Sequence, residues 1–178
     1  MTTTRLDFSK LTLMDALDLA TLIELEAHRR YTSFAKQLGT RGGNDPGSVF
    51  ASMAGNEKKH GDVIGARRFA LFGNKRPAVT LDDIFDVEAP DVGSTRWDMS
   101  ALSAFRIALF SEQKAYAFYD AALPGVKNPD VKALFEELRD EEAEHVRMIQ
   151  EIIAKLPPES ATELEDEDDE ERERGTGV

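Results

Sequence analysis

The chain has 178 residues, of which 41% are hydrophobic, and it carries a formal net charge of −12. This length suffices for one domain with a sizeable core, and the chain contains no run of about 18 apolar residues that could cross a membrane. Cysteine is absent, which excludes disulfides, iron–sulfur clusters and thiolate-bound zinc within this chain.

Two helices are predicted in the first half, one over residues 12–38 and one from Asp45-Pro46 to near Gly73. An Asp followed by Pro is typical of an N-cap and the first helical residue. In both segments apolar residues recur at steps of three and four, as on the buried face of a helix. These stripes are Leu13, Leu17, Ala20, Ala27, Tyr31, Phe34 and Leu38, then Val49, Met53, Ile64 and Leu71.

Two further helices are predicted in the second half, over residues 100–123 and from Asn128-Pro129 to just before Pro157. Asn128-Pro129 repeats the combination of a cap and a proline at the first helical position. The apolar stripes of these helices are Leu102, Phe105, Leu109, Tyr116, Tyr119 and Leu123, then Val131, Phe135, Leu138, Ile149 and Ile152.

The lengths of the connections predict the topology. Loops of about six and five residues join the helices of each half, so each half is expected to form an antiparallel hairpin. The 74–99 connection is long enough, at roughly 3.3 Å per residue, to run the length of a bundle. We therefore expect an all-α four-helix bundle over residues 1–158 with one long crossover. Within the crossover we expect a short helix at 81–87 and an anchoring role for Trp97.

Each hairpin supplies a lone glutamate and a Glu-x-x-His pair. Residues three apart lie on one face of a helix, and all these side chains interrupt the apolar stripes at similar depth. A buried carboxylate is costly unless it is paired or binds a metal. This set is typical of dinuclear metal sites in four-helix bundles. Glu-x-x-His pairs that arose by chance would not be expected to lie on the buried faces of their helices at the same level of the bundle. The predicted ligands are Glu24, Glu57, His60, Glu112, Glu142 and His145.

Carboxylates with one imidazole per metal suit two iron ions, with manganese as a substitute. We expect Glu57 and Glu142 to bridge the ions, Glu24 and Glu112 to bind one ion each, and each histidine to bind one ion. His28 is expected to be peripheral.

The sequence gives less support for a role of other polar residues near these motifs in metal binding. Glu141 and Glu144 are expected to be solvated or to lie outside the ligand set. Three tyrosines on the inward stripes either hydrogen-bond a ligand carboxylate or serve only in packing: Tyr31, Tyr116 and Tyr119.

Residues 159–178 contain ten acidic and two basic side chains and are expected to form a disordered tail. Such a tail could attract Fe(II), or dock on a basic partner such as an electron-donor protein or a compartment shell. The sequence has no cluster of Lys and Arg residues that would indicate binding of nucleic acid. Residues 1–10 lack the apolar stretch of a signal peptide, so we expect a cytoplasmic protein.

Three segments resemble motifs of the rubrerythrin branch of the ferritin-like superfamily. Residues 24–35 resemble its first-helix signature Glu-x-x-Ala-x-x-x-Tyr-Thr-x-Phe-Ala, and residues 56–60 and 140–145 resemble its second- and fourth-helix motifs. The resemblance covers about residues 12–155. It implies a non-haem di-iron centre that reacts with hydrogen peroxide or dioxygen.

The chain departs from that family pattern in two respects. It has no cysteine-ligated rubredoxin domain, so electrons must come from a separate donor protein or from Fe(II) itself. Ala115 stands where the family has a further glutamate, one turn after the third-helix ligand, which favours a plainer ferroxidase or oxidase site.

Three functions are therefore weighed. The first is a di-iron oxidoreductase of the peroxidase or ferroxidase type, which reduces peroxide or O2 and oxidises Fe(II). The second is an iron storage or delivery protein, and the third is a metal-free interaction module acting through the tail. For either iron protein we expect a homo-oligomer, a dimer or larger.

Overall fold

The structure, a computed structural model, describes residues 6–39, 45–80, 87–91 and 93–162. Among these residues there is no strand, and the all-α prediction is confirmed. The α-helices are α1 Leu13–Leu38, α2 Pro46–Phe72, α3 Ala101–Ala122 and α4 Pro129–Lys155. Short 3-10 helices lie at Phe8–Lys10, Leu123–Gly125 and Pro158–Ala161. The bounds of the α-helices agree closely with those predicted.

Each α-helix begins where a polar side chain caps its first turn. The Thr12 hydroxyl accepts a hydrogen bond from the backbone N–H of Asp15, whose carboxylate accepts in return from the N–H of Thr12. Pro46 and Pro129 occupy first helical positions, as predicted from the sequence. The four capping residues are Thr12, Asp45, Ser100 and Asn128.

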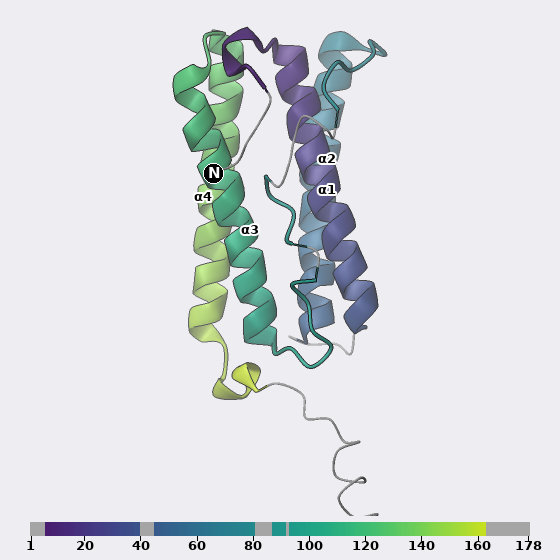
Figure 1. The fold of residues 1–178 in the computed structure, drawn as a ribbon, viewed down its shortest axis with the longest axis vertical. Helices are drawn as coiled ribbons and strands as arrows, with labels where there is room; N and C mark the ends of the chain where they lie inside the picture. Colours follow the sequence, from purple (N-terminus) through teal and green to yellow (C-terminus); the bar gives the residue numbers. More distant parts are fainter. Residues whose placement is uncertain (1–5, 40–44, 81–86, 92, 163–178) are drawn as a thin grey trace, which may run out of the picture.

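The helices form two antiparallel hairpins, and the predicted topology is confirmed. α1 packs mainly against α2, and α3 packs mainly against α4. Figure 1 shows α2 and α3 running in the same direction, so the crossover between them returns along the length of the bundle. This path brings the middle of the crossover to the level of the helix centres.

Two apolar layers form the core, one towards each end of the bundle. One layer includes Leu17, Ile23, Tyr119 and Phe135. The other includes Tyr31, Phe34, Phe50, Phe105 and Ile149. Each layer draws on both hairpins, so the apolar packing joins them above and below mid-bundle. The candidate ligands lie in the sequence between these two layers.

Several apolar residues face solvent although we expected them inside. Tyr116 is 38% exposed because the buried face of α3 is centred on Glu112, Ala115 and Tyr119, which leaves Tyr116 at its margin. Leu71 lies in the last turn of α2, where the neighbouring Phe72 packs on the core instead. Ile152, also exposed, borders a surface pocket.

The crossover is not anchored by Trp97, which is 56% exposed, so that prediction was wrong. Buried apolar residues among the described part of the crossover include Val79, Val87, Ala89 and Met99. These smaller side chains fit against helices that already pack closely, whereas an indole needs a larger space. The short helix expected at 81–87 lies, apart from Val87, outside the described residues.

A buried ion pair directs the start of the crossover. The Arg68 guanidinium of α2 donates to both carboxylate oxygens of Asp18 of α1, at 2.7 and 3.2 Å. The same group donates to the backbone carbonyls of Gly73 and Lys75, at 2.7 and 2.6 Å. Arg68 therefore ties the first hairpin to the first residues of the crossover.

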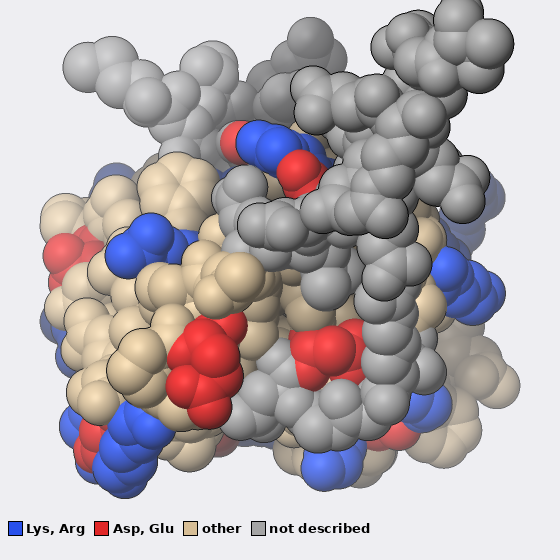
Figure 2. Space-filling view, turned by 90° about the horizontal axis from the view of Figure 1, so that it is seen from below, with Lys and Arg blue, Asp and Glu red and all other residues tan. Residues whose placement is uncertain are grey.

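Charge is mixed on the end of the bundle that Figure 2 shows, where basic and acidic side chains lie interspersed over the described surface. The acidic tail expected at 159–178 begins in the 3-10 helix Pro158–Ala161, and from residue 163 onward it lies outside the described residues. No described helix has both the length and the apolar character needed to cross a bilayer.

Candidate metal centre

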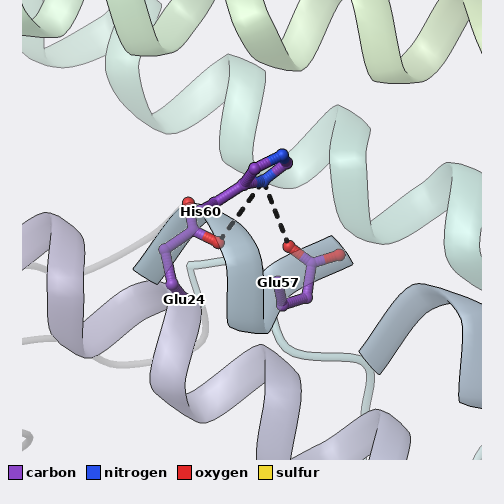
Figure 3. A group of neighbouring side chains, drawn as sticks. All are labelled: Glu24, Glu57 and His60. Atoms are coloured by element: carbon purple, nitrogen blue, oxygen red, sulfur yellow. Dashed lines mark ion pairs between the residues drawn. The ribbon is translucent and has the colours of Figure 1, made fainter. Parts of the chain in front are cut away.

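The first group of candidate ligands comes from the first hairpin. His60 Nδ1 lies 3.8 Å from Oε2 of Glu24 and 3.8 Å from Oε2 of Glu57. Figure 3 shows the two carboxylates directed at the same ring nitrogen from α1 and α2. Gly61 permits this approach, because a Cβ at that position would lie only 3.3 Å from the Cβ of Glu24.

The second group comes from the second hairpin and has the same composition. His145 Nδ1 of α4 lies 3.2 Å from Oε2 of Glu112 of α3, within hydrogen-bond distance, and 3.4 Å from Oε2 of Glu142. In each group the candidate ligand atoms all lie within 4.8 Å of one another. Each hairpin thus presents two carboxylates and an imidazole to one point.

The two groups face each other across the bundle. The imidazole rings of His60 and His145 are stacked, with centroids 4.7 Å apart and planes 2° apart. The six residues predicted from the sequence are therefore all brought together at mid-bundle. Their arrangement repeats the same parts in the two hairpins.

Glu88, in the crossover, also reaches this centre and was missed in the sequence. One oxygen of Glu88 groups with Glu24 and Glu142, and one groups with Glu57 and Glu112, again within 4.8 Å. The only signal in the sequence is one acidic residue between Val87 and Ala89 in a non-helical segment, which is weak because no periodicity shows which way such a residue faces.

Burial and like charge dominate the electrostatics of the carboxylates. Burial, followed by the charge of Glu142, raises the pKa of Glu24 to about 8. Burial also raises the pKa of Glu57 and of Glu142 well above the ordinary range, and in both cases the charge of Glu88 is the next cause. The pKa of Glu88 is itself well raised, by burial and then by the charges of Glu24 and Glu112. Without a bound cation these groups therefore tend to hold protons.

The two histidines differ in their electrostatics. Burial and then the charge of His145 lower the pKa of His60. Burial alone would lower the pKa of His145 too, but the hydrogen bond to Glu112 and the charge of that carboxylate outweigh it and raise this pKa. A histidine binds a metal ion through its neutral imidazole. His60, with the lowered pKa, is therefore more readily available for metal binding than His145.

The centre suits divalent cations because many of its buried acceptors are unsatisfied. Among the described residues, these atoms have no hydrogen-bond partner: Oε2 of Glu24, Oε1 of Glu112, Oε2 of Glu142 and both oxygens of Glu88. Buried polar atoms are ordinarily paired, and hard carboxylate oxygens with imidazole nitrogens are the ligands of iron and manganese. The residues present therefore fit a pair of such ions.

A pocket of about 430 Å³ leads from the surface to this centre. Its inner wall includes Glu57, Glu112 and His145, while the exposed Met148 and Ile152 lie at its outer edge. The remaining lining residues are Ser48, Val49, Ser52, Met53, Asn56, Phe105 and Ile149. A small molecule can thus reach the carboxylates and His145 between α2 and α4.

Three polar residues expected to lie outside the ligand set are placed in line with that expectation. His28 Nδ1 is engaged by the carbonyl of Ala54 of α2 at 2.8 Å, in line with a peripheral position. Glu141 and Glu144 are exposed, and Glu144 pairs with Arg147.

The two buried tyrosines do not hydrogen-bond a ligand carboxylate. Tyr31 stacks on Phe50 and Tyr119 packs edge-on against Phe135, with ring centroids 5.9 and 5.4 Å apart. Among the described residues neither hydroxyl has a hydrogen-bond partner. Of the two alternatives, the packing role is the one this geometry supports.

Comparisons with known proteins agree with this fold. The chain resembles the solved structure of an uncharacterized conserved protein from Magnetospirillum magnetotacticum MS-1, with 31% identity and a TM-score of 0.63, over 83% of this chain and 97% of that one. A putative ferritin-like diiron-carboxylate protein from Thermotoga maritima is more distant, with 20% identity and a TM-score of 0.49, over 82% of this chain and 96% of that one.

A curated relative is the encapsulin nanocompartment cargo protein EncC of Myxococcus xanthus (strain DK1622). It is 34% identical over 64 residues, which is 36% of this chain and 49% of the relative, so the match spans about half of its length. The Rubrerythrin family model matches residues 15–95 and 103–176, which is most of the chain. The chain therefore belongs to the Rubrerythrin family, with a ferritin-like four-helix bundle as its fold.

Proposed function

We propose that the chain is a non-haem di-iron oxidoreductase that reduces hydrogen peroxide or O2 and oxidises Fe(II). The observation that carries this proposal is the convergence of buried, unsatisfied carboxylates and two imidazoles at mid-bundle. The residues that would hold the two ions, with Mn as a substitute for Fe, are Glu24, Glu57, His60, Glu112, Glu142 and His145. When bound, a pair of ferrous ions supplies two electrons and open coordination positions.

The reaction balances with Fe(II) as the reductant. Hydrogen peroxide takes up two electrons and two protons, its O–O bond breaks, and two waters leave, while two Fe(II) become two Fe(III). The chain has no cysteine, so the electrons would come from Fe(II) or from a separate donor protein.

The residues of the pocket support the approach of a small oxidant. Peroxide and O2 are small enough for a pocket of about 430 Å³ whose inner wall contains Glu57, Glu112 and His145. Ser52 and Asn56 line the same route and offer hydrogen bonds to peroxide, while the apolar lining limits bulk water. Met148 and Ile152 at the outer edge would exclude larger molecules.

Iron storage or delivery is the second candidate, favoured by the relative named as an encapsulin cargo protein. In this role the chain would act inside a protein shell in the cytoplasm, as a dimer or larger oligomer. The acidic residues 159–178 would attract Fe(II) or dock on a basic partner. Here oxidation of Fe(II) would serve uptake rather than removal of peroxide.

Anaerobic titration of the full chain with Fe(II), followed by peroxide or by air in a stopped-flow absorbance experiment, tests these proposals. The enzyme should bind two Fe(II) per chain and oxidise them rapidly with at least one of the two oxidants. Slow oxidation with continued uptake beyond two ions would favour storage. A chain that binds no iron would contradict both proposals and favour a metal-free interaction module.

A further inference from the structure

We infer that Glu88 is a seventh ligand of the metal centre, a carboxylate that bridges the two ions from the crossover. This inference rests on the proposed function, because it requires that the centre bind two ions. It concerns a residue outside the four helices and outside the two Glu-x-x-His motifs.

The position of Glu88 between the hairpins carries the bridging role. Its oxygens lie within 4.8 Å of ligand atoms of Glu24 and Glu142 in one group, and of Glu57 and Glu112 in another. Those four carboxylates come from four different helices. Only a side chain at the middle of the centre can be this close to all of them, and that is where a ligand shared by two ions must lie.

Among the described residues, burial and the like charges of Glu24 and Glu112 have the largest effects on Glu88. The residue is 1% exposed, and among the described residues neither of its oxygens has a hydrogen-bond partner. An ionised carboxylate that is buried in this way is strongly destabilising, so Glu88 either holds a proton or is compensated by a cation. Two bound ions would supply that compensation to both oxygens at once.

Contacts on either side of Glu88 hold it at the centre. Val87 and Ala89 are buried, and the carbonyl of Ala89 accepts a hydrogen bond from Lys114 Nζ of α3 at 3.0 Å. The start of the crossover is held to the first hairpin through Arg68. The crossover is therefore attached to both hairpins. These attachments hold residues 87–89 in place, with the side chain of Glu88 directed at the centre.

A fifth carboxylate also changes the charge of the centre. The four helical carboxylates balance the charge of two Fe(II). With two Fe(III) they leave a net charge of +2, which Glu88 reduces to +1. In a buried site such a difference matters, because charges interact strongly where water is excluded. Glu88 should therefore favour retention of the oxidised pair as well as binding of the reduced one.

The test compares Glu88→Gln with Glu136→Gln in the full chain. Glu88→Gln keeps the size of the side chain and removes its charge, while Glu136→Gln makes the same change on α4, at a side chain that is 48% exposed. Fe(II) binding is measured anaerobically by equilibrium dialysis and metal analysis. We expect two Fe(II) per chain for the unmodified protein and for Glu136→Gln, and a loss of affinity of about tenfold or more in Glu88→Gln.

The outcomes separate this inference from the proposed function. Unchanged Fe(II) affinity in a folded Glu88→Gln variant would overturn the bridging role and leave the proposed function standing, whereas no Fe(II) binding by the unmodified chain would overturn both. Should Glu88→Gln fail to fold, a crystal structure of the Fe(II)-loaded unmodified chain decides. Glu88 oxygens bound to both ions support the inference, and a carboxylate that contacts neither ion or only one overturns it.

Discussion

Single side chains of the metal centre differ in what their loss should do. Glu142 is buried and forms part of the second group of candidate ligands, while Glu144, two residues later, is exposed and pairs with Arg147. We predict that Glu142→Ala lowers Fe(II) affinity by about a hundredfold or more, since even residues that only support a ligand contribute 10–100-fold. Equilibrium dialysis against Fe(II) measures the loss.

Glu144→Ala is the matched control for this change and should bind two Fe(II) like the unmodified chain. Glu57→Ala should behave like Glu142→Ala, because Glu57 occupies the equivalent position in the first hairpin. Circular dichroism should show that both variants remain helical, as the apolar layers lie away from the site. Full iron stoichiometry in both variants would contradict the assignment of the ligands.

The raised carboxyl pKa values predict how the stability of the metal-free chain depends on pH. The pKa of Glu24 rises from 4.5 to about 8 in the folded state. The folded chain therefore binds more protons than the unfolded chain between these values, and its stability falls as pH rises. The expected slope is about −1.4 kcal/mol per pH unit for each carboxyl that stays protonated only in the fold.

Urea denaturation of chelator-treated protein across this pH range measures that slope. The iron-loaded protein is the comparison, and we expect the opposite trend, because ions bind deprotonated ligands and their affinity rises with pH. A metal-free chain that becomes more stable between about pH 5 and pH 8 would disprove the protonated state of the buried carboxyls.

At the level of the helices, two glycines of α2 allow a comparison of packing next to the site and one turn away from it. A Cβ at Gly61 would lie 3.3 Å from the Cβ of Glu24, whereas a Cβ at Gly65 would lie 4.0 Å from Cγ2 of Thr21, an ordinary contact. Alanine favours a helix over glycine by about 1 kcal/mol at either position. We predict that Gly65→Ala raises the free energy of unfolding by up to about that amount, and that Gly61→Ala raises it less or lowers it.

Gly61→Ala should also weaken Fe(II) binding, since it pushes α1 and Glu24 away from His60. Urea denaturation and Fe(II) dialysis of both variants give the two measurements. Equal stability gains and unchanged Fe(II) binding in the two variants would show that the separation of α1 and α2 at Glu24 has no bearing on the centre.

For the whole molecule, metal binding should link the two hairpins and the crossover. One ion present at about a hundredfold above its Kd adds about 2.7 kcal/mol to stability. For a chain of this length we predict a rise in Tm of about 5–10 °C with Fe(II) or Mn(II). Anaerobic thermal denaturation measures it, and a chelator should reverse the rise.

The same concentration of Mg²⁺ is the control, because Mg²⁺ retains its water and prefers oxygen ligands, so it should shift Tm far less. Equal shifts with Mg²⁺ and Mn(II) would point to general charge compensation by the many acidic residues instead of binding at the centre.

What could be predicted from the sequence is what helical periodicity determines. A helix repeats every 3.6 residues, so the spacing of the apolar residues shows which face is buried, and Asp45-Pro46 and Asn128-Pro129 show where two helices begin. The same periodicity placed each Glu-x-x-His pair on the buried face at similar depth. The roles of the six residues as ligands stay predictions.

Only the tertiary structure decided the positions of residues outside that periodicity. The crossover has no repeat, so its path depends on how the two hairpins pack and on contacts such as that of Lys114 with Ala89. For this reason Glu88 was missed, and Trp97 was wrongly expected to be an anchor. Which carboxylates face one another also depends on the separation of helices that are distant in sequence. Local spacing thus determined the helices and their inward residues, and long-range packing determined the centre that these residues form.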